Sequence, residues 1–306
     1  MGYLYITIAS ILFSSQFAFT KQFQRRAGKD FQAIFLSYAV GPIAFIVLTL
    51  CTEGFHLQVT PFSLVFSLYA VCSSFLMGYC TINALAAGSL SNYSIFMMSG
   101  GMILPCVYGA IWGGDDFGVF KILGIALILS SVFVKIDFKE KAAFKTYVYL
   151  TILFILNGMA GVVASIYQSD IFPYARPTPK QYALGNSLFT MTAGWLAFIV
   201  CIIVNRNKAK RELGEAYDKE AQKQQLIRYA KAAPWSMGSG LVNNIGNLLL
   251  LFALLTVQPS VQYPIITGGS IFLSALIGLI FFKEKPDKRT WISVALAVIG
   301  TIVIVL

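Results

Sequence analysis

The chain has 306 residues, of which 57% are hydrophobic and only 12% are charged, and its mean hydropathy is +0.73. Soluble globular domains carry roughly 25% charged residues, so this composition excludes a water-soluble fold and indicates a protein that lies in a lipid bilayer. The net charge of +10 would suggest nucleic-acid binding in a soluble protein. Here the basic residues occupy short connections between apolar runs, so we expect them to set membrane topology and expect no nucleic-acid partner.

Ten stretches are long and apolar enough to cross a bilayer as helices, which requires about 20 residues each. In chain order they cover residues 3–21, 32–52, 62–83, 91–113, 118–136, 146–168, 184–204, 233–255, 260–282 and 289–306. No basic segment precedes the first stretch and no A-x-A-like site follows it, so we expect a membrane helix there instead of a signal peptide. The sequence therefore predicts an all-α integral membrane protein with ten transmembrane helices.

Lysine and arginine are distributed unevenly among the connections between these stretches. Of the 23 basic residues, 20 fall in the odd-numbered connections, and the others are Lys121, Arg176 and Lys180. Because basic residues accumulate on the cytoplasmic side, we expect the odd connections in the cytoplasm and both termini outside it. The longest connection, residues 205–232, contains pairs such as Lys208/Glu212 at i,i+4 spacing, which favour a solvated helix.

The second half of the chain repeats features of the first. At an offset of 168 residues, Ser99-Gly100-Gly101 aligns with Thr267-Gly268-Gly269, and Asp116 aligns with Glu284. This predicts two repeats of five helices, residues 1–137 and 138–306, with residues 205–232 as a cytoplasmic loop inserted in the second. Since five is an odd number, the second repeat crosses the membrane in the opposite direction. Inverted repeats of this kind are typical of secondary transporters.

The end of the chain reads Pro264-Ile-Ile-Thr-Gly-Gly269, then Phe281-Phe-Lys-Glu-Lys-Pro-Asp-Lys-Arg-Thr-Trp291 and Gly300. Together with the five-plus-five arrangement, it resembles the drug/metabolite transporter superfamily, of the EamA type. Repeats of that family often end in an apolar helix, a short turn with a glutamate, and a last helix with a glycine. Glu284 stands where that glutamate is expected, whereas the first half departs with Asp115-Asp116 in its turn. The resemblance implies transport, most commonly export.

The centres of the predicted helices contain no acidic residue, basic residue or histidine. Charges inside a membrane are costly and usually functional, so this pattern argues against a carboxylate that exchanges protons for a lipophilic cation and favours a neutral or zwitterionic substrate. Uncharged polar groups there need partners inside the protein or in a wet cavity. We predict that the following residues line a central substrate cavity: Gln16, Tyr38, Tyr79, Tyr93, Asn157, Asn243, Asn247 and Tyr263. Interhelical hydrogen bonding is the alternative for each residue taken singly.

Tyr79 aligns with Asn247 at the offset of 168, so we expect these two side chains to flank the membrane midplane as a pseudo-symmetric pair. The glycines Gly100, Gly101, Gly268 and Gly269 are predicted to permit close helix packing or hinge motion. Charges and aromatic rings near helix ends are usually interfacial. We assign Lys21, Tyr182 and Trp195 to that class.

The sequence contains no motif for catalysis or cofactor binding. The five cysteines lie in or beside apolar runs without a CxxC pair, and His56 is the single histidine, so we expect no disulfide, metal or cofactor. GxxxxGK[ST] and HExxH motifs are also missing. We therefore expect neither an enzyme nor transport driven directly by ATP.

The first hypothesis is a secondary transporter that moves a small polar organic metabolite, such as an amino acid, across the inner or plasma membrane by alternating access. Export is the direction that the resemblance implies. Its partners would be the lipid bilayer and the small-molecule substrate, with the chain acting as a monomer or homodimer. The alternative is multidrug efflux of aromatic or cationic compounds, which the many phenylalanines and tyrosines keep open. A membrane enzyme or receptor-like scaffold would need clustered histidines or acids, or a large soluble domain.

Overall fold

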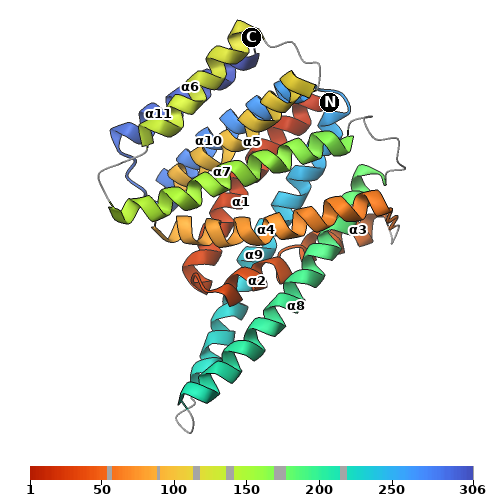
Figure 1. Cartoon of the computed structure of the whole chain (residues 1–306), viewed down its shortest axis with the longest axis vertical. Coiled ribbons are helices and arrows are strands. Elements are labelled where there is room, and N and C mark those ends of the chain that lie inside the picture. Colours follow the sequence, from red (N-terminus) through yellow and green to blue (C-terminus); the bar gives the residue numbers. More distant parts are fainter. Residues whose placement is uncertain are drawn as a thin grey trace.

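The computed structural model describes residues 1–53, 57–87, 90–112, 118–135, 141–168, 177–213 and 219–305. Within these residues the chain folds into α-helices and contains no β-strand (Figure 1). The helices are Gly2–Ala27 (α1), Phe31–Val40 (α2), Ile43–Glu53 (α3), Pro61–Ala87 (α4), Leu90–Trp112 (α5), Val119–Lys135 (α6), Lys141–Gln168 (α7), Pro179–Leu213 (α8), Lys219–Leu254 (α9), Pro259–Phe282 (α10) and Lys288–Val305 (α11).

Eight helical segments of the described chain are long and apolar enough to cross a membrane, with α2 and α3 counted together as one segment. The apolar part of α6, Val119–Val134, is shorter than these. The expectation of an all-α, multi-pass membrane protein is therefore confirmed. Each predicted stretch overlaps one observed helix, except residues 32–52, which overlap two.

The break in residues 32–52 lies at Gly41 and Pro42, between α2 and α3. Proline has no backbone N–H to continue the helical hydrogen bonds, so the ladder is interrupted at Pro42 even though Gly41 keeps helical angles, φ −53° and ψ −50°. The break is held against α9, because the Ser236 hydroxyl donates a 2.9 Å hydrogen bond to the Ser37 carbonyl. A Cβ atom on Gly240 would overlap the Gly41 carbonyl, so α9 approaches the break at backbone contact.

Residues 205–232, which were predicted to be a cytoplasmic loop inserted in the second repeat, are largely helical. Residues 205–213 continue α8 and residues 219–232 begin α9, while residues 214–218 lie outside the described chain. The i,i+4 charge pairs that favoured a solvated helix are consistent with this result. As a consequence, α8 and α9 extend past the other helices at one end of the bundle, at the bottom of Figure 1.

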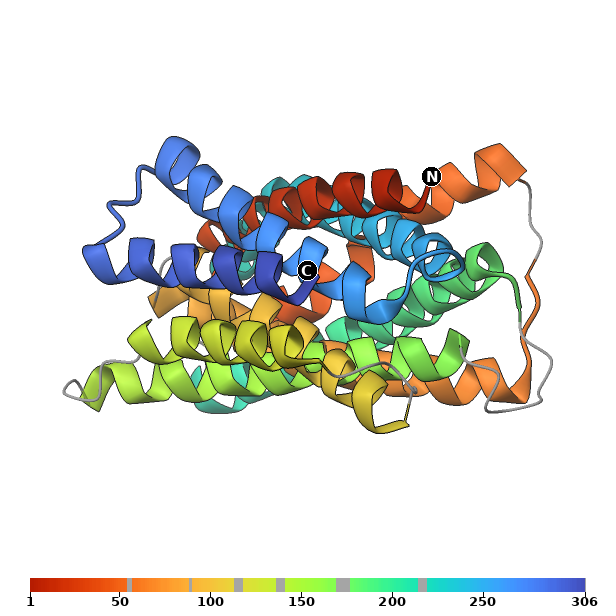
Figure 2. The same ribbon diagram turned by 90° about the horizontal axis from the view of Figure 1, so that it is seen from above.

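Helices distant in the sequence pack against each other. α1 lies against α9 and α10, and α7 lies against α4 and α5. α5 also crosses α10, α2 packs on α8, and α6 packs on α11 along one side of the bundle (Figures 1 and 2). The helices of the first and second halves of the chain are therefore intermixed, so that a cavity enclosed by the bundle is bounded by both.

Small residues bring several of these helices close together. A Cβ atom on Gly100 would overlap the backbone of Phe154 on α7, and one on Gly101 would overlap the Asn157 amide. Gly268 lies against Thr301 of α11, and Gly269 lies against Ser10 of α1. These four glycines thus occupy close helix contacts of the kind that small residues allow in membranes. A hinge role for them stays a prediction.

Candidate functional site

A cavity of about 430 Å³ lies in the middle of the bundle. Its walls come from α1, α2, α4, α5, α7, α8, α9 and α10, together with Gly41 and Pro42 at the break between α2 and α3. This volume falls in the range of small-molecule sites. Both halves of the chain therefore contribute to one central space.

Seven of the eight residues predicted from the sequence as cavity residues line this space. They are Gln16, Tyr38, Tyr93, Asn157, Asn243, Asn247 and Tyr263. Several also form the interhelical hydrogen bonds that were the alternative interpretation, so the two interpretations are compatible. The hydroxyls of Tyr38 and Tyr263 donate to the Ser74 and Gly161 carbonyls, and the Asn157 amide donates to the Met97 carbonyl at 2.7 Å.

Tyr79, the eighth predicted residue, is not among the residues that line the cavity. Its ring stacks on Phe31 with centroids 5.3 Å apart, and its hydroxyl lies 3.4 Å from that of Tyr149. The expected pairing of Tyr79 with Asn247 across the midplane is therefore wrong. The reason is helical periodicity, because neighbouring residues point about 100° apart and it is Gly78, not Tyr79, that faces the cavity.

The cavity wall on α9 carries a run of carboxamides. The Asn247 amide donates to the Asn243 carbonyl at 2.9 Å and to its side-chain oxygen at 3.1 Å. Asn244 donates to the Gly240 carbonyl and accepts a 3.1 Å hydrogen bond from the Ser187 hydroxyl on α8. These bonds orient the amides of one helix toward the cavity, where they can donate to and accept from a polar ligand.

Asn186 on α8 is a cavity residue that sequence reasoning missed. Its side-chain oxygen is buried and has no hydrogen-bond partner within the protein. Leaving a buried acceptor unpaired costs about 1–3 kcal/mol, so this oxygen is suited to receive a donor from a ligand. The signal was present in the sequence, since Asn186 is an amide close to the start of the apolar stretch 184–204.

Aromatic side chains form the wall of the cavity near the start of α4 and the end of α7. Tyr167 stacks on Tyr182 with ring centroids 4.2 Å apart and meets Phe66 edge-on at 5.4 Å. All three residues line the cavity. Tyr182 was expected to be an interfacial anchor, but the stacking on Tyr167 draws it into the protein. Trp195 is 39% exposed and packs on Phe198 instead.

The residues described as lining the cavity include no Asp, Glu, Lys, Arg or His. Charged side chains gather instead at one end of the bundle, where α1 ends, α5 begins and α10 ends. We call it the basic end. Lys21 was expected to be an interfacial charge, but it is only 5% exposed and forms an ion pair with Glu284. The Glu284 carboxylate also accepts a 3.0 Å hydrogen bond from the Leu90 amide, the first of α5.

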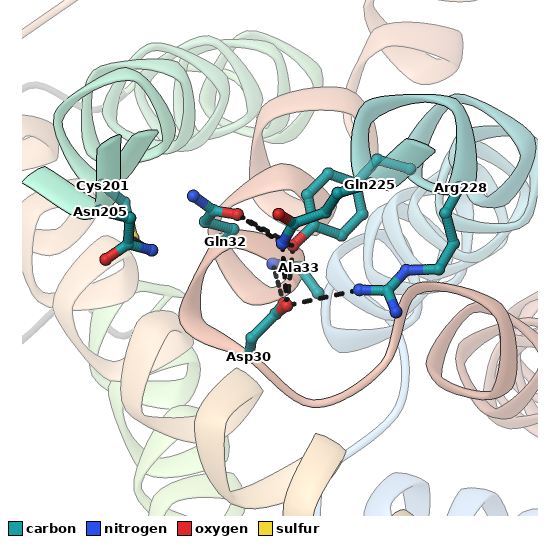
Figure 3. Close-up of polar contacts among 8 residues, drawn as sticks. Asp30, Gln32, Ala33, Cys201, Asn205, Gln225 and Arg228 are labelled. Atoms are coloured by element: carbon teal, nitrogen blue, oxygen red, sulfur yellow. Dashed lines mark hydrogen bonds and ion pairs between the residues drawn. The ribbon is translucent and has the colours of Figure 1, made fainter. Parts of the chain in front are cut away.

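A second polar cluster at the basic end joins α2 to α9 (Figure 3). Asp30 caps α2 by accepting a 2.9 Å hydrogen bond from the Ala33 amide. Its other oxygen accepts a 2.8 Å hydrogen bond from the buried Tyr229 hydroxyl and lies 3.5 Å from the Arg228 guanidinium. Gln225 completes the cluster by donating to Gln32 at 2.8 Å. The first connection of the chain is thus fastened to the extended start of α9.

Comparison with known proteins identifies a similar fold. No family model matches the sequence, and no curated protein matches it. A crystal structure of another protein superposes on 99% of this chain and on 95% of its own chain, with a TM-score of 0.61 and 14% sequence identity. At that identity the similarity establishes a shared overall fold and carries no statement about activity.

Proposed function

We propose that the chain is a secondary transporter that moves a small neutral or zwitterionic organic metabolite, such as an amino acid, by alternating access. The observation that carries this proposal is the uncharged polar cavity at the centre of a multi-pass membrane bundle. Polar groups in such a bundle need partners in protein or water, and a cavity of about 430 Å³ offers room for a solute. Binding near the midplane is the usual arrangement in secondary transporters.

The packing of the helices supports two inverted repeats of five helices, residues 1–137 and 138–306. In this proposal α1 corresponds to α7, α2 with α3 to α8, α4 to α9, α5 to α10, and α6 to α11. When each helix is replaced by its counterpart, the contacts of α1 with α9 and α10 become the contacts of α7 with α4 and α5, which are also present. It leaves the pairs α5 with α10, α2 with α8, and α6 with α11 unchanged. A pseudo-two-fold axis in the membrane plane has this property.

We further propose that the chain belongs to the drug/metabolite transporter superfamily, of the EamA type. It would lie in the inner or plasma membrane. The basic residues favour a cytoplasmic basic end and extracytoplasmic termini. Export is the direction that the family resemblance favours. The chain would act with the lipid bilayer and its substrate, as a monomer or homodimer.

The lining also limits the chemistry of the substrate. A ligand with a net charge would lose its hydration in a cavity whose described lining offers no opposite charge, and this loss is unfavourable. Donors and acceptors on α8 and α9 suit an uncharged or zwitterionic polar molecule. Efflux of aromatic compounds is a second candidate, because Tyr167, Tyr182 and Phe66 give one wall of the cavity an aromatic surface.

A thermal-shift screen of the detergent-purified protein against metabolites and drugs tests the proposal. A ligand that binds only the folded state raises apparent stability by mass action, about 2.7 kcal/mol at 100 times its Kd. Stabilisation by one class of polar metabolite, followed by uptake of that compound into proteoliposomes, supports metabolite transport. Stabilisation by aromatic drugs alone favours drug efflux. Binding of a compound without any transport in proteoliposomes argues for a receptor and against both.

A further inference from the structure

The Glu284 carboxylate connects three separate elements at the basic end of the bundle. It follows the end of α10, one of its oxygens accepts from both the Lys21 ammonium of α1 and the Leu90 amide of α5, and those partners lie far from it in sequence. The negative carboxylate at the start of α5 also complements the positive end of that helix's dipole. A single side chain of the second half thus joins two helices of the first.

The backbone conformation at Lys283 directs the Glu284 side chain toward α1. Lys283 ends α10 in the left-handed conformation, with φ 51° and ψ 33°, and the Glu284 amide returns to the Gly278 carbonyl at 3.0 Å. The Phe282 ring lies beneath the basic groups of α1, with the Lys21 ammonium 5.2 Å and the Arg25 guanidinium 4.8 Å from its centroid. This turn therefore presents both an anion and an aromatic face to α1.

The contacts of Glu284 with Lys21 and Leu90 lie beside the cavity. Thr20, which precedes Lys21 on α1, and Phe23, two residues after it, line the cavity, and so does Tyr93 in the first turn of α5. Phe17 and Tyr93 form the next layer, edge to face with centroids 5.3 Å apart. For the cavity to open toward the basic end between α1 and α5, the contacts of Glu284 with Lys21 or with Leu90 have to separate.

The ion pair is buried but incompletely satisfied. Only 6% of the Lys21 side chain and 12% of the Glu284 side chain are exposed, and the second carboxylate oxygen of Glu284 is buried without a hydrogen-bond partner. Charges removed from water lose hydration, and their attraction compensates fully only when the remaining lone pairs are bonded as well. Opening would hydrate Lys21 and both oxygens of Glu284. A contact that is attractive when closed and well hydrated when open is suited to reversible separation.

We propose that Lys21, Glu284 and the Leu90 amide form a gate that closes the cavity at the basic end and separates when that end opens. The inference rests on the proposed transport function and adds the place where alternating access is controlled. In the described structure Glu284 contacts both Lys21 and the Leu90 amide, so the gate is closed. Alternating access then predicts that a solute enters from the opposite end in this state.

The test measures from which side of the membrane a reagent reaches the cavity. Ser73 lines the cavity in the middle of α4, and Ser73→Cys is introduced after all five native cysteines are replaced by alanine. A membrane-impermeant methanethiosulfonate is applied to right-side-out and inside-out vesicles. A separate Lys288→Cys variant at the exposed start of α11 identifies the side on which the basic end lies.

With the gate intact, we expect Ser73→Cys to react from the opposite side and slowly from the basic side. Glu284→Gln and Lys21→Met, each added to this background, are expected to raise the reaction rate from the basic side at least about 10-fold, a shift of about 1.4 kcal/mol in the opening equilibrium. The double variant gives no larger increase, because both changes open one gate. Lys21→Arg, which keeps the ion pair, and Lys285→Gln, which removes an exposed charge from the same turn, leave the rate unchanged.

Lys21→Met keeps the gate testable if Glu284→Gln protein does not fold. Unchanged basic-side labelling in a folded Lys21→Met or Glu284→Gln variant, with normal labelling from the opposite side, overturns the gate and leaves the transport proposal intact. An equal increase in Lys285→Gln also overturns it, because general weakening of the turn then explains the result. Labelling of Ser73→Cys from neither side in any variant contradicts the transport proposal itself, and the gate with it.

Discussion

Tyr182 stacks face to face on Tyr167 across the junction of α7 and α8, with ring centroids 4.2 Å apart and an interplanar angle of 23°. Both residues line the central cavity, and Tyr167 is otherwise buried, with only 2% of its surface exposed. The pair comes from opposite sides of residues 169–176, which lie outside the described chain. Its geometry makes the aromatic wall the part of the cavity best suited to recognise a flat or apolar group.

Removing one ring of this pair is expected to weaken binding of ligands with an aromatic group. Tyr182→Ala deletes an aromatic contact of about 0.5–1.5 kcal/mol, so we expect affinity for such a ligand to fall about 3–10-fold. Titration of the ligand found in the thermal-shift screen, by calorimetry in detergent, gives the dissociation constants. Tyr182→Phe keeps the stacking and serves as the matched control. Equal affinity of Tyr182→Ala and the unmodified protein would exclude the aromatic wall from ligand recognition.

Asn247 and Tyr79 were predicted as equivalents and are expected to behave differently. Asn247 lines the cavity and its amide bonds stay within α9, so Asn247→Leu should lower ligand affinity about 3–10-fold with little change in melting temperature. Tyr79→Phe removes a hydroxyl outside the cavity lining and should leave affinity unchanged. Parallel binding and melting measurements on the two variants check both statements. If Tyr79→Phe weakened ligand binding and Asn247→Leu left it unchanged, Tyr79 and not Asn247 would be the residue that contacts the ligand.

Gly100 is expected to be intolerant of any side chain. The methyl group of Gly100→Ala would overlap the Phe154 backbone, which cannot move aside as a flexible side chain can. Overpacking of this kind typically destabilises a protein by about 1–3 kcal/mol. Gly118→Ala is the control, because a Cβ atom there meets no other atom within 4 Å. Thermal unfolding in detergent should show a clear drop for the first variant and none for the second; equal melting temperatures would contradict the close contact of α5 with α7.

Substitutions in the cluster around Asp30 should distinguish the contribution of helix capping to stability from that of the ion pair. Asp30→Ala removes both the cap of α2 and the acceptor for the Tyr229 hydroxyl, and should destabilise the protein by about 1–2 kcal/mol. Asp30→Asn retains a capping side chain and should have a smaller effect. Arg228→Gln should change stability by less than about 0.5 kcal/mol, because both partners of that ion pair are nearly half exposed and water screens it. Melting temperatures that order the three variants differently would contradict this division.

The sequence alone determined that this is a helical membrane protein and where its helices run. Crossing a bilayer requires about 20 apolar residues, and whether a stretch meets this requirement depends only on its own residues. The stretch 32–52 is the exception, because it is divided at Gly41 and Pro42. The missing N–H of Pro42 weakens the helix there, but Pro105 and Pro264 lie inside continuous helices, so a proline by itself did not decide the break.

The composition of the cavity was also accessible from the sequence, because uncharged polar residues inside apolar helices have few alternatives to a polar interior. Which of them face the cavity was decided by the rotation of each helix, which depends on its neighbours. A turn of about 100° separates Gly78 in the lining from Tyr79 outside it. Tyr182 similarly reaches the cavity only because α7 brings Tyr167 against it.

Long-range pairing was decided by the tertiary structure alone. The sequence assigned Lys21 to the interfacial charges and Glu284 to the turn after an apolar stretch, and 263 positions separate them. Their burial becomes favourable only when α1, α5 and α10 are packed together and each charge can find the other. The physical reason is that the bilayer dictates where helices form, residue by residue, whereas the contacts between helices depend on shape and partner and have no local signal in the chain.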